Sequence, residues 1–83
     1  MPDALCLIKS KVIQGRWIIQ RTVLALKYRL FCGDAKHCLV RYDNEAGKGD
    51  HRHYGQHEEP YTFTTLETLL EDFQADVIRL TQE

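Results

Sequence analysis

Long apolar runs are absent from this 83-residue sequence, and none reaches the roughly 18 residues that a membrane-spanning helix needs. The opening residues, Met-Pro-Asp-Ala, also lack the basic stretch followed by an apolar stretch that marks a secretory signal peptide. Hydrophobic residues make up 43% and charged residues 28%, a globular composition rather than a disordered one. We therefore expect one cytoplasmic domain over residues 1–83 with no membrane partner.

Cysteine is scarce, and the common catalytic and metal-binding motifs are missing. The three cysteines are an odd number and lie in apolar, strand-like runs, where free cysteine behaves as a small buried hydrophobe. Cys32 and Cys38 flank a predicted turn, but this does not make a disulfide framework. The sequence has no H-E-x-x-H, no paired C-x-x-C, no P-loop and no carboxylate cluster of the two-metal kind. These absences speak against the corresponding enzyme classes.

Basic residues are nearly missing from the last third of the chain. Residues 57–83 hold seven acids and one base, Arg79, whereas residues 1–56 hold ten Lys and Arg against five acids. A basic body with an acidic terminal element could bind a polyanion on one face. The alternative is that a terminal helix simply carries acids on its solvated side.

Hydrophobic alternation predicts strands at Ala4–Ile13 and His37–Asp43. Gln14-Gly15 and Gly33-Asp34 are turn signals, since glycine accepts the positive φ of tight turns. Proline and glycine are missing between Arg16 and Cys32, which is rich in β-branched and aromatic residues. That segment is too long for one ordinary strand, so we expect a bulge or bend near residues 22–25. A helix over residues 16–26 is the competing interpretation.

The sequence pattern from residue 44 onward predicts a loop and then a helix. Residues 44–59 contain almost nothing apolar and predict a long polar loop, followed by a short strand at 60–63. Thr64 and Glu67 fit a capping box, and an apolar stripe then follows at helical spacing. We expect this helix over residues 65–80, packed on the sheet. The predicted fold is therefore α+β: a small antiparallel sheet of four to five strands, about residues 4–43, packed by one C-terminal α-helix.

The polar segment around residues 41–57 contains the candidate catalytic and substrate-binding residues. Histidine titrates near neutral pH and suits general acid–base catalysis, and cationic side chains stabilise phosphate charge. Paired glycines at 47 and 49 allow the backbone to turn sharply beside a ligand. Cleavage of a phosphodiester through the ribose 2′-hydroxyl needs a base, an acid and positive charge, and no metal. The segment supplies all of these types from His51, His53, Arg41, Lys48 and Arg52, with Tyr42 and Tyr54 as stacking surfaces for bases.

Two other interpretations of this segment stay open. Asp50, His51, His53 and His57 are potential metal ligands, and a two-residue spacing on an extended chain puts both rings on one side. The plainer interpretation is a solvated loop in which Asp50 only accepts neighbouring N–H groups. We expect no metal and no cofactor.

Several strings of this sequence resemble the TumE family. They are Lys27-Tyr28-Arg29-Leu30, Val40 to Asn44, Gly47 to His53, Pro60 to Phe63, and the Leu70 to Val77 part of the terminal helix. The resemblance covers about residues 4–80. It implies the toxin component of a toxin–antitoxin module, usually encoded beside a helix-turn-helix antitoxin, with a suspected ribonuclease activity. The family pattern leads us to expect a Pro/Gly-bearing loop near residues 21–26, where this sequence is apolar and uninterrupted.

The leading hypothesis is therefore a toxin that cleaves RNA without a metal. In it, His51 and His53 act as base and acid in an order that the sequence does not assign, and Asp50 orients a histidine. Arg41 and Lys48 stabilise the phosphorane, while Arg52, Tyr54 and Tyr42 contact the substrate. Lys27 and Arg29 extend the basic surface. The expected partners are the antitoxin and RNA, and such a small domain also gains stability as a homodimer. The alternatives are a non-catalytic module that binds nucleic acid or protein, and a toxin that transfers a nucleotide or phosphoryl group.

Overall fold

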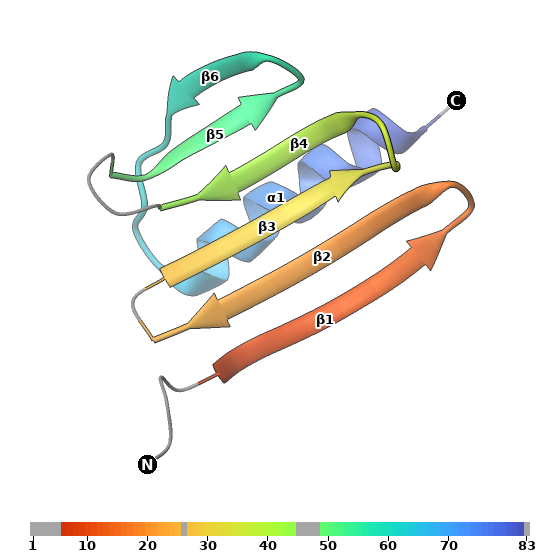
Figure 1. Ribbon diagram of the computed structural model, residues 1–83. Coiled ribbons are helices and arrows are strands. Elements are labelled where there is room, and N and C mark those ends of the chain that lie inside the picture. Colours follow the sequence, from red (N-terminus) through yellow and green to blue (C-terminus); the bar gives the residue numbers. More distant parts are fainter. Residues whose placement is uncertain (1–5, 26, 45–48, 83) are drawn as a thin grey trace.

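The computed structural model describes residues 6–25, 27–44 and 49–82, with side chains from residue 8 onward. Six antiparallel strands follow one another in chain order across a single sheet, and a helix lies against one of its faces (Figure 1). The elements are β1 (Cys6–Gln14), β2 (Trp17–Leu24), β3 (Lys27–Gly33), β4 (Cys38–Asp43), β5 (His51–Tyr54), β6 (His57–Pro60) and α1 (Leu66–Thr81). The α+β class is confirmed, with six strands rather than four to five. No helix in these described ranges is long and apolar enough to cross a bilayer.

A hairpin turn, not a bulge, divides the long β-rich segment. β2 ends at Leu24 and β3 begins at Lys27, and Ala25 between them has φ +37°. Tight hairpins favour glycine, asparagine or aspartate at such a φ, and none of these is present here. The break expected near residues 22–25 is therefore present at the end of that range, as a hairpin turn, and the competing helix over residues 16–26 is wrong. The register shifts that do occur lie between Cys6 and Ile8, and between Cys32 and Gly33.

The polar loop expected over residues 44–59 is wrong for its second half, which forms the β5–β6 hairpin. Gly55, with φ +62°, lies at its turn. The expected strand at 60–63 is also wrong, because β6 ends at Pro60 and residues 61–65 lie in no strand. These strands carry few apolar residues, so periodicity could not reveal them. Their backbone groups are satisfied by pairing, β5 with β4 and β6 with β5. Residues 45–48, including Lys48, lie outside the described residues.

The hydrophobic core lies between the sheet and α1. Leu30, Val40 and Tyr42 of the sheet are fully buried, as are Leu69 and Phe73 of the helix. Side chains alternate between the two faces of a strand, so the residues between these core positions point to the opposite face. In the described ranges no other element covers that opposite face (Figure 1), which we call the open face.

The helix forms as the apolar stripe predicts, over residues 66–81 instead of 65–80. Its N-cap is Thr65, whose hydroxyl oxygen accepts a hydrogen bond from the backbone N–H of Thr68. The predicted capping box of Thr64 and Glu67 is therefore off by one residue. Both threonines can cap, and the chain's exit from β6 decides between them.

A buried carboxylate fastens the helix to the sheet. The hydroxyls of Tyr42 on β4 and Tyr54 on β5 each donate to Asp76 Oδ2 at 2.6 Å, and Arg79 Nη2 donates to Oδ1 at 2.9 Å. Burial alone would raise the pKa of Asp76, but these three hydrogen bonds outweigh it and hold that pKa below its ordinary value. The carboxylate therefore stabilises the fold in its charged form.

We predict that Asp76→Asn lowers the free energy of unfolding by about 1–3 kcal/mol at pH 7, because it weakens hydrogen bonds to buried tyrosine hydroxyls. A depressed folded-state pKa stabilises fully above the ordinary aspartate value of about 3.9, and this contribution is lost as the pH falls through the folded-state pKa. Urea unfolding from pH 7 to pH 3 should therefore show a smaller acid-induced loss in Asp76→Asn than in the wild type. Glu71→Gln, on the exposed side of the same helix, is the control. Equal stability of Asp76→Asn and wild type at pH 7 would contradict the assignment.

Candidate active site on the open face of the sheet

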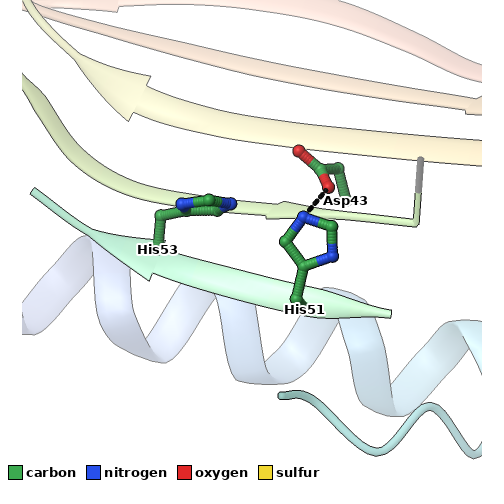
Figure 2. Close-up of side chains that lie close together, drawn as sticks. All are labelled: Asp43, His51 and His53. Carbon is green, nitrogen blue, oxygen red and sulfur yellow. Dashed lines mark ion pairs between the residues drawn. The ribbon is translucent and has the colours of Figure 1, made fainter. Parts of the chain in front are cut away.

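Five polar side chains from three neighbouring strands meet on the open face. They are Arg41 and Asp43 of β4, His51 and His53 of β5, and Glu58 of β6, and we call them the open-face cluster. The strand register brings them together, since Asp43 lies opposite His51 while Arg41, His53 and Glu58 form the next row. Figure 2 shows the two histidines projecting from β5 toward β4, where Asp43 meets His51.

His51 lies among oxygen atoms. Its Nε2 is 2.8 Å from Asp43 Oδ1 and 3.4 Å from Glu58 Oε2, and its Nδ1 lies 3.1 Å from the carbonyl oxygen of Gly49. The His51 and Asp43 residues are only 7% and 9% exposed. Within the described chain, Asp43 Oδ1 accepts no hydrogen bond of good geometry, so the two residues are close without a well-formed hydrogen bond. Both ring nitrogens of His51 therefore face oxygen atoms, which can accept hydrogen bonds.

His53 has the opposite surroundings. Arg41 Nη2 lies 2.9 Å from His53 Nε2, and a guanidinium can only donate, so this ring nitrogen must carry a lone pair. Burial lowers the pKa of His53, and the charge of Arg41 lowers it further. His53 is thereby held neutral beside His51, with the two ring centroids 4.9 Å apart. Two adjacent imidazoles in such different surroundings suit complementary proton-transfer roles.

Glu58 marks the point on which both rings converge. Its Oε2 lies 3.4 Å from His51 Nε2 and 3.7 Å from His53 Nε2, and its side chain is 45% exposed. The place between the two rings is therefore reachable from solvent and already favours a negatively charged oxygen. A phosphate oxygen would find the same partners once the flexible glutamate side chain turns outward.

The structure brings together three of the predicted catalytic residues, Arg41, His51 and His53. Lys27 and Arg29 of β3 also lie on the open face, and Arg29 is directly opposite Asp43 in the register. Lys48 is outside the described residues. Sequence reasoning missed Asp43 and Glu58, although Asp43 shares the two-residue spacing of Arg41 on its strand. Glu58 could be found only by recognising the hairpin that places it opposite His53.

The position of Asp50 does not support the orienting role that the sequence predicted for it. Asp50 Oδ2 accepts a hydrogen bond from the Tyr28 hydroxyl at 2.7 Å, so its carboxylate is engaged away from the cluster. Asp43 holds His51 instead. The prediction chose Asp50 because it precedes His51 in sequence, whereas contact across the sheet is set by pairing between strands.

The substrate contacts predicted for Arg52, Tyr42 and Tyr54 are not supported by their positions under the helix. The Arg52 guanidinium carbon lies 5.5–5.8 Å from the centroids of three tyrosine rings, and Arg52 Nε donates to Glu59 Oε2 at 2.6 Å. Tyr42 and Tyr54 bind Asp76. These residues follow or precede cluster residues by one position, so they point to the other face and hold β4, β5 and α1 together.

Asp43, His51 and His53 also satisfy the spacing of a metal site, with one ligand atom from each lying within 4.8 Å of the others. Arg41 competes for this place. Its Nε lies 3.0 Å from Asp43 Oδ2 and its Nη2 lies 2.9 Å from His53 Nε2, so a cation would have to displace a guanidinium from two of the three ligands. Of the other ligands predicted for a metal, Asp50 binds Tyr28, and exposed His57 pairs with Glu59.

Comparison with known proteins agrees with the predicted resemblance. The family model described as Toxin TumE matches residues 2–81 of the 83-residue chain. This chain belongs to the TumE family. Membership makes it the toxin of a toxin–antitoxin module, with a cognate antitoxin as its partner. No curated protein and no solved structure matches it, so the chemistry of this TumE toxin has to be argued from its own residues.

We predict that Arg41→Gln raises the pKa of His53 toward the ordinary histidine value of about 6.5, because it removes the nearest positive charge. An NMR titration of the imidazole C–H resonances measures this directly. In the wild type, His53 should stay neutral until the pH falls below that ordinary value. Arg29→Gln, a cation removed from the same face, is the control and should shift the His53 pKa less. A His53 pKa that is unchanged or lower in Arg41→Gln would contradict the assigned contact.

Proposed function

We propose that this TumE toxin is a metal-independent ribonuclease that uses the ribose 2′-hydroxyl of its substrate as the nucleophile. One observation carries the proposal: two neighbouring imidazoles face the same solvent-accessible point with opposite hydrogen-bonding surroundings. His53 accepts from a guanidinium, and His51 faces oxygen atoms. A base and an acid set side by side are what transesterification of RNA requires, and family membership as a toxin is consistent with attack on RNA.

In the proposed reaction, His53 Nε2 takes the proton of the 2′-hydroxyl. The 2′-oxygen then forms a bond to phosphorus while the bond from phosphorus to the 5′-oxygen breaks. His51 gives a proton to the departing 5′-oxygen. The products are a 2′,3′-cyclic phosphate and a 5′-hydroxyl. The starting protonation is restored when His53 releases its proton to solvent and His51 takes one up from solvent.

Positive charge is available where the phosphorane would form. Arg41 leaves His53 Nε2 when substrate arrives and turns its donors to the non-bridging oxygens, which arginine binds in bidentate fashion. Arg29, exposed and opposite Asp43, adds a second cation to the same face. Asp43, 2.8 Å from His51 Nε2, and the Gly49 carbonyl, 3.1 Å from His51 Nδ1, keep the His51 ring in place.

We predict that His53→Ala lowers the rate of RNA cleavage by about 10²-fold or more and relieves growth arrest when the toxin is expressed alone, because general base catalysis is lost. His51→Ala should do the same through loss of the acid. Cleavage of total RNA by the purified protein, followed on gels, measures the rate.

The matched control is His57→Asn on the same hairpin. His57 is exposed and lies opposite Tyr54, away from the cluster, so cleavage should remain at the wild-type rate. Circular dichroism establishes that each variant is folded. Wild-type protein that binds RNA with a steep salt dependence and leaves it uncut across a pH series would replace the proposal with a non-catalytic binding module.

We also predict that cleavage is unchanged after dialysis against EDTA, because His53, His51 and Arg41 supply base, acid and positive charge. The ends of the RNA product also identify the mechanism, since attack by the 2′-hydroxyl leaves a 2′,3′-cyclic phosphate. Loss of activity on chelation with recovery on adding Zn²⁺ or Mn²⁺ would reassign Asp43, His51 and His53 as metal ligands.

A further inference from the structure

The open face continues beyond the cluster onto β3 and β2. In the row that holds Arg41 and His53, the next residue on β3 is Phe31, and Gln20 of β2 follows it. All the aromatic residues lie in the described ranges, and the register places every other strand aromatic on the helix side. Tyr61, Phe63 and Phe73 also contact helix-side tyrosines. Phe31 is thus the one ring of the described chain beside the cluster.

Phe31 lies along its strand instead of standing up from the sheet. A Cβ built on Gly33, two residues further on, would meet the tip of the Phe31 ring at 2.8 Å. A ring perpendicular to the sheet could not reach that position, because neighbouring same-face positions on a strand are about 6.5–7 Å apart. The missing side chain of Gly33 makes room for this orientation, and Phe31 remains partly exposed.

Arg29 completes the arrangement. Its guanidinium carbon lies over the Phe31 ring, 5.5 Å from the centroid, and the side chain is exposed. Aromatic rings and guanidinium planes are the two protein surfaces on which unpaired bases stack. Here both occur in one contact, one strand away from Arg41.

We propose that Phe31 and Arg29 form a stacking platform for an unpaired base next to the scissile phosphate, so that single-stranded RNA is the substrate of this toxin. This inference rests on the proposed function and narrows its substrate class. A base in a duplex is stacked on its neighbours and cannot lie on a sheet, whereas a base in a single strand can be turned outward. Gln20 at the far side of Phe31 offers amide groups to the edge of such a base.

The test uses two substitutions that distinguish the effect of the aromatic ring from the effect of apolar volume. Phe31→Leu keeps an apolar side chain without a ring, and Phe31→Tyr keeps the ring. Both are made in a His53→Asn background, which prevents cleavage during binding. The probes are a fluorescein-labelled twelve-nucleotide oligoadenylate and an RNA duplex of the same length, followed by fluorescence anisotropy. Phe31→Leu should weaken oligoadenylate binding about tenfold, the lower end of the effect of losing one stacked base, while Phe31→Tyr should stay within about twofold of the parent.

Duplex binding should not distinguish the two variants. Ile13→Ala, an exposed apolar residue at the far end of β1, is the control for general loss of apolar surface. Equal oligoadenylate affinity of Phe31→Leu and Phe31→Tyr would overturn the platform, as would absence of oligoadenylate binding in the parent. Thermal melting shows whether each variant is folded.

The two proposals fail separately. If cleavage depends on His53 but oligoadenylate binding is unaffected by Phe31→Leu, the ribonuclease proposal stands and the stacking platform is rejected. Ring-dependent binding of oligoadenylate by a protein that cuts no RNA leaves the platform and removes the catalytic mechanism.

Discussion

Side-chain alternation along β4 and β5 is the constraint on which both the fold and the candidate site depend. Arg41 and Asp43 point to the open face while Tyr42 between them points to the helix; His51 and His53 are likewise separated by Arg52. A shift of one residue in the register of either strand would move its open-face side chains to the helix side and its helix-side side chains to the open face. The charges would then enter the core and the tyrosine anchors would leave it, so the pairing of core and cluster is fixed by a single register.

Charged side chains are neutralised differently on the helix side and on the open face of the sheet. Under the helix, Asp76 is matched by three donors, and Arg52 by three aromatic rings and Glu59, so these groups act as fixed supports. On the open face, five ionisable groups share one another's contacts at distances of 2.8–3.7 Å and remain within reach of solvent. Groups whose partners are shared can exchange them at low cost.

Arg41 is the link between the electrostatics of the cluster and its chemistry. By donating to His53 Nε2 it keeps that nitrogen unprotonated, and by approaching Asp43 it balances the charge that holds His51. The same side chain contacts two of the three residues that satisfy the spacing of a metal site, and in the proposed function it binds phosphate. A toxin built this way needs only a rigid sheet, one helix to support it, and a face left free for its partner molecules.

The sequence by itself determined the terminal helix and the antiparallel sheet, and it named Arg41, His51 and His53 as candidates, because apolar periodicity and the side-chain chemistry of histidine and arginine are local properties. It also carried the resemblance that the family match confirmed. Only the tertiary structure decided that β5 and β6 exist, that Asp43 and not Asp50 meets His51, and that Arg52, Tyr42 and Tyr54 face the helix. Those facts depend on which strand pairs with which and in what register. Burial of one face of the sheet and the geometry of the turns make that choice, and β5 and β6 carry too few apolar residues for a pattern along the chain to show it.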